Sequence, residues 1–389
     1  MQTIDRFQRI RAEINLDAIR YNLENMKRNL PSETGMYAVI KAEAYGHGAV
    51  EIAKEIEAVP YLIGFCVATA EEGVTLREAG IKKSILILGY TFPESLKMIA
   101  ENDLTPTIFT LASAEALSAT AQKAKRNLPF HLAVDTGMSR IGLQVSREDA
   151  DIAAKIIALP GLSFEGIFTH FAKADEADKT ATAEQYARFL QMIAYLEEKG
   201  IAIPKKHCAN SATIMELPQY AMDAVRAGIT LYGLLPSEEV DPTRLSLHPV
   251  MALTSHVSHV KELTDGRTIS YGGTYTVTGK KMIATVPVGY ADGYPRSLSN
   301  CGEVLIKGTR APICGRVCMD QFMVDVTAIE DVHTGEEVRL LGSQGNETIT
   351  LEELAEKSGR INYELACDIG KRVPRIFLKE SEIVATRQF

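Results

Sequence analysis

The chain has 389 residues, of which 46% are hydrophobic and 24% charged, and its formal net charge is -8. This length and composition are typical of a globular protein with one large and one smaller domain. No apolar run approaches the ~20 residues that a membrane span needs. The acidic balance argues against nucleic acid, whose phosphates bind clustered Lys and Arg. We therefore expect a small-molecule ligand, with neither a membrane nor a nucleic acid as partner.

The N-terminal residues and the cysteines together indicate a cytoplasmic protein. MQTIDRFQRIRAEINLDAI carries charge throughout and lacks the apolar core of a secretory signal. Six cysteines are spread along the chain without CxxC pairs, so we expect reduced thiols and no disulfide framework. His256 and His259 in LTSHVSHV are expected on opposite faces of one strand, so we predict no metal site.

From residue 36 to about 232, short apolar runs alternate with amphipathic helical patterns. Eight such units are the number that closes a (β/α)8 barrel. An open doubly wound sheet would carry GxGxxG after its first strand, and the chain has AEAYGHG there. We therefore predict an α/β fold built on a TIM barrel. Its strands are expected at residues 36–41, 61–67, 84–89, 105–109, 130–135, 162–170, 205–209 and 223–227.

The sequence changes character after residue 233. LLPSEEVDPTRLSLHP has three prolines and no periodicity, which is typical of a linker. Short alternating strands with glycine turns follow, plus one helix near ITLEELAEKSG. We place the barrel in residues 15–240 and a β-rich domain in residues 241–389. Residues 1–14 are expected to form a segment that packs with the C-terminal domain.

Polar side chains collect where the predicted barrel strands end. Functional residues of barrels lie at the carboxyl ends of strands and in the loops that follow. Each candidate alone has an ordinary explanation: a solvated rim charge, a structural histidine or a helix cap. Their shared position on one rim is what favours a functional site. The candidates are Lys41, Arg140, His170, Asn210, Ser211 and Arg226.

This set of residues suits one cofactor. A lysine sheltered from water loses part of its preference for the charged form, which favours a Schiff base. Backbone N–H groups at Ser211, Gly228 and Ile229 would hold a phosphate. A phosphate-bearing aldehyde held by a lysine is pyridoxal 5'-phosphate, which we therefore expect as the cofactor.

The motifs resemble those of the alanine racemases, and the resemblance covers nearly the whole chain. Nine matches in the same order across both domains make a chance similarity very improbable. The family's architecture, a barrel joined to a β domain, agrees with the predicted one. The matching stretches are VIKAEAYGHG, VDTGMSRIG, GIFTHFAKAD, HCANSA, VRAGITLYG, ISYGGTY, PVGYADGYPR, GRVCMDQ and NYELACDIGKRVPR.

The resemblance implies that Lys41 holds the cofactor as a Schiff base and that Arg226 meets the pyridine nitrogen. A guanidinium stays protonated, so it donates to the ring nitrogen without protonating it, and the ring becomes a weaker electron sink. The other cofactor-binding residues that the resemblance implies are Tyr45, His170, Asn210, Ser211, Gly228, Ile229 and Tyr363.

Racemisation requires a base on each face of the substrate Cα. The resemblance implies Lys41 on one face and, on the other, Tyr271 of the SYGGTY motif, contributed by the other subunit of a homodimer with shared active sites. Free tyrosine titrates near ~10, so cations are needed to make it a usable base. Arg226 and His170 are the candidates. The product, D-alanine, would supply cell-wall peptidoglycan.

The substrate would be an amino acid held by its carboxylate. The resemblance assigns that contact to Arg140 and to the main-chain N–H of Met319. It also implies residues at the entrance that restrict substrate size, namely Asp175, Tyr290, Arg296 and Arg316.

Two positions depart from the family pattern. Many members have a carbamylated lysine two residues before the Asp of VDTG, and this chain has Ala133. Because Arg140 would then lack an anionic partner, we expect a chloride, another anion or a water network nearby. Glu43 stands where many members have asparagine. It is either a charge that affects Lys41 or an outward loop carboxylate.

Three rival functions remain open. The nearest is a racemase of serine or of broader specificity within the same family, although Tyr363 favours alanine. Barrel-type decarboxylases of basic amino acids usually place an acid on the pyridine nitrogen, so Arg226 argues against them. Non-catalytic cofactor-binding barrels lack the β domain that carries Tyr271.

Overall fold

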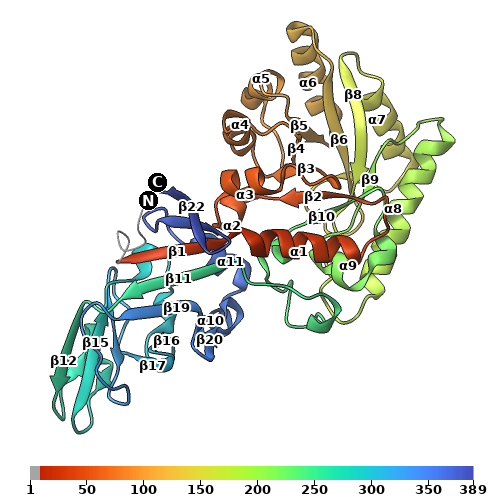
Figure 1. The fold of residues 1–389 in the computed structure, drawn as a ribbon. Helices are drawn as coiled ribbons and strands as arrows, with labels where there is room; N and C mark the ends of the chain where they lie inside the picture. The colour runs from red at the N-terminus through yellow and green to blue at the C-terminus, as the bar shows by residue number, and fades with distance from the viewer. Residues whose placement is uncertain (1–8, 389) are drawn as a thin grey trace.

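The first half of the chain forms a closed barrel of eight parallel strands (Figure 1). The structure, a computed structural model, describes residues 9–388. Backbone hydrogen bonds close the ring: the Arg226 N–H donates to Ala209 O at 2.9 Å and the Asp223 N–H to Lys206 O at 3.1 Å. The predicted (β/α)8 barrel is confirmed. In sheet order its strands are β10 (Ala224–Ala227), β2 (Gly35–Val39), β3 (Leu62–Val67), β4 (Ser84–Ile87), β5 (Thr105–Ile108), β6 (Leu128–Asp135), β8 (Leu162–Phe168) and β9 (Lys206–His207).

Helices surround the barrel, and several of them begin directly after a threonine or serine whose side chain caps the helix. Thr69, Thr110 and Ser146 each accept a hydrogen bond from the N–H three residues on. The last strand is followed by the 3₁₀ helix η4 (Ile229–Tyr232). No helix within residues 9–388 is both long and apolar enough to cross a bilayer. The α-helices are α1 (Leu16–Arg28), α3 (Ala49–Ile56), α4 (Ala70–Glu78), α5 (Leu96–Glu101), α6 (Leu111–Ala124), α7 (Arg147–Ile157), α8 (Thr180–Glu198) and α9 (Ser211–Glu216).

A large, mostly antiparallel sheet forms the second half of the molecule (Figure 1). The expected β-rich character is confirmed, and the expected helix is α10 (Leu351–Ser358). A second helix, α11 (Asn362–Asp368), was not expected, because seven residues are too few to show helical periodicity. The strands in sheet order are β12 (His259–Leu263), β15 (Lys281–Val286), β18 (Phe322–Asp325), β17 (Thr309–Cys314), β16 (Glu303–Ile306), β19 (Glu337–Gln344), β11 (Met251–His256), β1 (Ile10–Asn15), β21 (Arg375–Lys379) and β22 (Glu382–Arg387).

The N-terminal strand lies inside this C-terminal sheet. β1 pairs antiparallel with β11, where Ala12 faces Leu253, and parallel with β21, where Ile14 faces Phe377. Residues 1–8 of the predicted N-terminal segment lie outside the described residues. The domain boundaries after residues 14 and 240 stay predictions.

The prediction that His256 and His259 share one strand was wrong. β11 ends at His256 and β12 begins at His259, so the two side chains belong to different strands of the sheet. The residues between them turn the chain, because the Ser258 N–H donates to Thr285 O at 2.9 Å and so starts the pairing of β12 with β15.

Candidate functional site

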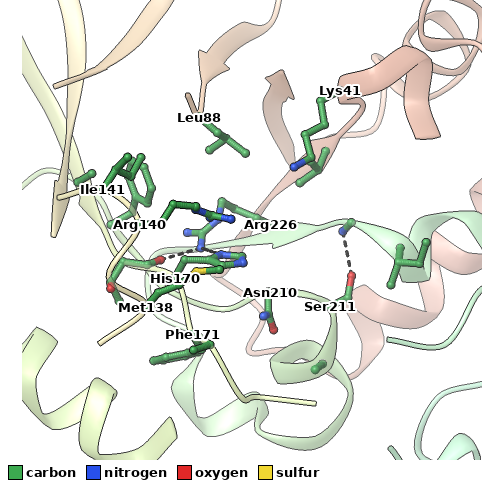
Figure 2. Close-up of a pocket in the computed structure, with 18 of the residues that line it drawn as sticks. Lys41, Leu88, Met138, Arg140, Ile141, His170, Phe171, Asn210, Ser211 and Arg226 are labelled. Atoms are coloured by element: carbon green, nitrogen blue, oxygen red, sulfur yellow. Dashed lines mark hydrogen bonds between the residues drawn. The ribbon is translucent and has the colours of Figure 1, made fainter. Parts of the chain in front are cut away.

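A cavity of about 460 Å³ opens at the carboxyl end of the barrel (Figure 2). The rim candidates named above all line it, although they come from five separate places in the chain. Figure 2 shows Lys41 reaching into this space opposite Arg226 and His170. The predicted residues that line the cavity are Lys41, Tyr45, Ala133, Arg140, His170, Asp175, Asn210, Ser211, Arg226, Gly228, Ile229 and Tyr363.

Lys41 lies two residues past β2, where the strand leaves the barrel core. Burial lowers the pKa of its ammonium group, and the nearby charge of Arg140 lowers it further. Both effects favour the neutral amine, which is the nucleophilic form that can bond to an aldehyde carbon. The lysine is therefore chemically suited to form a Schiff base.

The chain makes a left-handed turn immediately after Lys41. Ala42, Glu43, Ala44 and Tyr45 have φ angles of 51°, 55°, 54° and 52°. Such a conformation costs about 1–2 kcal/mol per residue for L-amino acids. Internal bonds partly offset this cost, for example from the Ala44 N–H to Ile40 O at 2.9 Å. Strain of this kind persists only where the surroundings impose it, and it is common at functional sites.

A cradle for a phosphate lies beside this turn. Ser211 Oγ accepts a hydrogen bond from the Gly228 N–H at 3.0 Å. A Cβ atom at Gly228 would lie 3.4 Å from both Ser211 Oγ and Tyr45 Oη, so it would fill the space where these groups converge. The absence of that atom leaves hydroxyl and N–H donors around one small volume, which fits a phosphate group. Asn210 caps α9 by accepting from the Thr213 N–H at 3.1 Å.

Arg226 is buried at the floor of the cavity without a carboxylate partner among residues 9–388. Its terminal nitrogens donate to Thr169 O at 2.7 Å, to His207 Nδ1 at 2.8 Å and to His170 Nδ1 at 3.1 Å. Within the described chain, its Nε–H is left without a hydrogen-bond partner. That donor is available to an acceptor such as a pyridine nitrogen.

Two histidines that sequence reasoning missed extend this network into the barrel core. Because Arg226 donates to Nδ1 of His207, the proton of His207 lies on Nε2 and is donated to Nδ1 of His131 at 2.9 Å. The Nε2–H of His131 is then a buried donor without a partner in the described chain. Burial lowers the pKa of both histidines, so both stay neutral. Only their strand positions could have indicated this role, because inward-facing residues alternate along barrel strands.

Arg140 lies in the same cavity and makes no ion pair among residues 9–388. Asp135, at the end of β6, accepts instead from the Gly137 and Ser139 N–H groups at 3.0 and 2.9 Å. Burial tends to raise the pKa of Asp135, but these bonds outweigh it and lower the pKa. Ala133 offers Arg140 no charge, so the guanidinium is available to a carboxylate.

Glu43 does not line this cavity, and an effect of its charge on Lys41 stays a prediction. Its oxygens accept from the two terminal nitrogens of Arg387 at 3.1 and 3.3 Å. The C-terminal domain also supplies Tyr363, on α11, whose ring centre lies 6.2 Å from that of Tyr45. Tyr363 narrows the cavity on the side of the β domain.

The remaining predicted residues do not line the cavity of Lys41. Tyr271 and Met319 share a shallow depression on the C-terminal domain, with 72% and 52% of their surfaces exposed. Tyr290 adjoins it, since its N–H donates to Cys318 O at 3.1 Å. Arg316 lies against the Tyr271 segment, where its O accepts from Ser270 Oγ at 2.6 Å. Arg296 is exposed on the same domain.

Comparison with known proteins agrees with this geometry. The alanine racemase N-terminal and C-terminal domain models match residues 14–236 and 250–377. An alanine racemase of Desulforamulus reducens is 47% identical over 94% of this chain and 98% of its own length. The structure of an alanine racemase from Clostridium difficile 630 is 42% identical and superposes with a TM-score of 0.94, over 97% of this chain and 98% of that one.

A histidine racemase of Leuconostoc mesenteroides subsp. sake also shares the fold, at 30% identity and a TM-score of 0.88 over 96% of this chain and 98% of that one. The two domain models lie in the expected order, and the similarity to alanine racemases spans nearly the whole chain. The chain therefore belongs to the alanine racemase family, whose enzymes depend on pyridoxal 5'-phosphate.

Proposed function

We propose that this protein interconverts L- and D-alanine with pyridoxal 5'-phosphate held by Lys41. The observation that carries the proposal is the single cavity in which Lys41, the phosphate cradle and Arg226 converge. Lys41 would bond to the aldehyde carbon. Tyr45, Ser211, Gly228, Ile229 and Tyr363 would surround the phosphate, and Arg226 Nε would donate to the ring nitrogen. His170 and Asn210 support the cradle and the arginine from the same strand ends.

The cofactor, when bound, withdraws electrons from the substrate Cα and so acidifies its proton. The chain supplies the groups that take and return that proton. The amine of Lys41 serves one face, because it enters the cavity from β2 alone. Arg140 holds the substrate carboxylate, which fixes the direction of the Cα–H bond relative to Lys41. The main-chain N–H of Met319 would add a second donor to that carboxylate.

We further propose a homodimer in which Tyr271 of the partner subunit serves the second face. Within one chain, Tyr271 and Met319 lie on a surface separate from the cavity of Lys41. Both side chains are largely exposed, and Tyr290 is exposed beside them. A second chain whose cavity meets this surface would bury these apolar side chains and complete both sites at once. Asp175, Tyr290, Arg296 and Arg316 would then line the shared entrance.

Mixing two inactive variants tests the shared site. In a heterodimer of Lys41→Ala and Tyr271→Phe chains, one site carries both substitutions and the other carries neither. Random reassortment should therefore restore about a quarter of the wild-type activity. If both bases belonged to the same chain, each site would stay damaged and mixing would restore nothing. Keeping the two homodimers apart in parallel samples provides the control.

We also propose that an anion or ordered water occupies the space between Ala133 and Arg140. The support is that Arg140 pairs with no carboxylate in the described chain and that Asp135 is turned to its own loop. Adding chloride in place of gluconate should lower KM for alanine, whereas an Ala133→Glu variant should become insensitive to chloride. An unchanged KM together with a crystal soaked in bromide that shows no anomalous peak would contradict the proposal.

A racemase of serine or of broader specificity is the second candidate. The specific observation in its favour is that a histidine racemase shares this fold at 30% identity. Tyr363 argues for a small substrate because it narrows the cavity. We expect kcat/KM for L-alanine to exceed that for L-serine by at least about tenfold, since each misfitted group in a pocket costs ~1–3 kcal/mol. A higher value for L-serine would reverse the assignment.

We infer that the protein acts in the cytoplasm and that its product supplies peptidoglycan synthesis. The support is family membership together with the acidic composition typical of cytoplasmic enzymes. Expression of the chain in a bacterial strain that requires D-alanine should allow growth without it, and Lys41→Ala should not.

A further inference from the structure

The left-handed turn after Lys41 has open space on both of its sides. One side is the cavity that Lys41 enters. On the other side lies a separate cavity of about 390 Å³, whose lining includes Ala42, Glu43, Glu72, Cys367 and Arg375. Ala44 and Tyr45 are buried in the core, whereas Ala42 is exposed and Glu43 is half-buried, so packing holds only the second half of this turn. Polar contacts must hold the first half, where the strained φ angles make them necessary.

The barrel provides one of these contacts, at the start of the turn. The Ala42 N–H donates to Glu72 Oε1 at 2.6 Å, and the other oxygen of Glu72 accepts from the Ala68 N–H at 2.7 Å. Glu72 thereby ties the turn to the loop after β3. This contact fixes only the first residue after Lys41.

The C-terminal domain provides the other contacts, from two arginines that face each other across β21 and β22. Arg375 pairs in register with Arg387. Arg375 Nε donates to Gly46 O at 3.0 Å, and its terminal nitrogens bind Gly370 O and Ile369 O at 2.7 and 2.6 Å. Both terminal nitrogens of Arg387 donate to the carboxylate of Glu43, whose Oε2 also accepts from the Ala49 N–H at 3.3 Å. Figure 1 shows β22 beside α2 (Lys41–Tyr45), the element that contains this turn.

We propose that Glu43 and Arg387 are positioning residues for the cofactor lysine, so that the C-terminal strand β22 sets the direction of Lys41. The inference rests on the proposed function of Lys41. Glu43 is the second of the four left-handed residues, and its carboxylate joins the less buried half of the run to the C-terminal domain through Arg387. Without it, the turn can relax toward ordinary backbone angles, and the amine of Lys41 moves with it.

The alternative is that the ion pair stabilises the domain junction without affecting Lys41. Partly exposed ion pairs usually contribute little to stability, so loss of stability alone does not distinguish the two roles. The reactivity of the lysine does, because it depends on where the amine lies in the cavity. It is measurable in protein stripped of cofactor, independently of racemase activity.

The test compares Glu43→Gln and Arg387→Gln with the charge-reversed double variant Glu43→Arg/Arg387→Glu. Arg147→Gln, which breaks an exposed pair with Glu198 on the far side of the barrel, is the matched control. In cofactor-free protein, the pH profile of Lys41 reductive methylation is followed by peptide mass spectrometry. The Kd for pyridoxal 5'-phosphate is then measured from the Schiff-base absorbance.

We expect each single variant to weaken cofactor binding by roughly tenfold to hundredfold, as expected for loss of a hydrogen bond to a charged group. Its methylation profile should shift, whereas Arg147→Gln should match the wild type. The double variant should recover most of the loss, which answers the question even if the single variants unfold. Wild-type Kd and methylation profiles in both single variants would overturn the inference. Failure of the wild type to form a Schiff base at Lys41 would instead overturn the proposed function.

Discussion

The cavity around Lys41 and the surface around Tyr271 differ in how completely one chain builds them. Within one chain, the residues of the barrel cavity are already held in place. Arg226 is buried and both of its terminal nitrogens are hydrogen-bonded, and Ser211 Oγ accepts from the Gly228 N–H. On the C-terminal side Tyr271 has 72% of its surface exposed. In the proposed mechanism, one chain preorganises cofactor binding and the first base, whereas the second base would come from the partner subunit. Cofactor binding and turnover should accordingly respond to different substitutions.

Lys41→Ala should have the largest effect, because it removes both the cofactor bond and one base. We expect activity to fall by at least about a thousandfold. The visible absorbance of the Schiff base, which borohydride removes in the wild type, should be absent. Lys97→Ala, on the exposed face of α5, should behave as the wild type. Persistence of a borohydride-sensitive band in Lys41→Ala would assign the cofactor to another lysine.

Tyr271→Phe should separate turnover from cofactor binding. Loss of a general acid or base costs about 10²–10⁴ in kcat. The Kd for pyridoxal 5'-phosphate should change little, because the residues proposed to hold the cofactor all line the cavity within one chain. Isotope exchange at Cα should persist from one enantiomer and be lost from the other. Tyr90→Phe, another exposed tyrosine, is the control. Unchanged racemisation would remove Tyr271 from the mechanism.

Buried histidines near the cavity of Lys41 should also make the free energy of unfolding depend on pH, whereas the exposed Tyr271 should not. Burial lowers the pKa of His47 from 6.5 to about 4. Below pH 6.5 the unfolded chain binds this proton and the folded chain does not, so stability falls as the pH drops from 6.5 toward 4 and is unaffected above 6.5. The loss should reach on the order of 2 kcal/mol at pH 5.

Urea unfolding at several pH values measures this effect. His47→Gln should reduce the pH dependence without abolishing it, because glutamine can still donate to Ala44 O and Tyr45 O without titrating, whereas His131 and His207 keep their lowered pKa. Tyr271→Phe should leave the slope unchanged. An equal slope in wild type and His47→Gln would show that other buried histidines account for it.

The smallest predicted effect concerns the histidines behind Arg226. His207→Phe keeps an aromatic ring but leaves a buried N–H of Arg226 without its acceptor, which should lower the free energy of unfolding by about 1–2 kcal/mol. His207→Gln retains both an acceptor and a donor, so it should recover most of the stability and the cofactor affinity. Equal unfolding free energies for the two variants would exclude this role of the Nδ1 acceptor.

The sequence predicted the barrel well because its strands are local and periodic. Every expected strand from residue 36 to residue 227 is present, although β9 keeps only Lys206 and His207. Predictions from hydrophobic periodicity were incomplete or wrong where an element is very short or depends on residues far away in the sequence. The short helix α11 shows no periodicity, and the break between His256 and His259 depends on pairing with β15.

The site was predicted as a list of residues, and its geometry was not. Strand-end positions placed Lys41, His170 and Arg226 on one rim, because barrel topology alone brings strand ends together. The contacts of Glu43 with Arg387, and of Arg226 with His207, join residues 344 and 19 positions apart. Nothing in the local pattern encodes such pairs. The left-handed turn was also unexpected, since three of its four residues are alanine or glutamate, which rarely adopt positive φ angles.

The placement of β1 has a consequence for the order in which the chain can fold during synthesis. β1 is made first, yet both of its edges pair with strands made much later, β11 at residues 251–256 and β21 at residues 375–379. A nascent chain that has completed the barrel still carries β1 with two open hydrogen-bonding edges, which invite pairing with other chains. β1 therefore stays unsheltered until β21, at residues 375–379, has been synthesised.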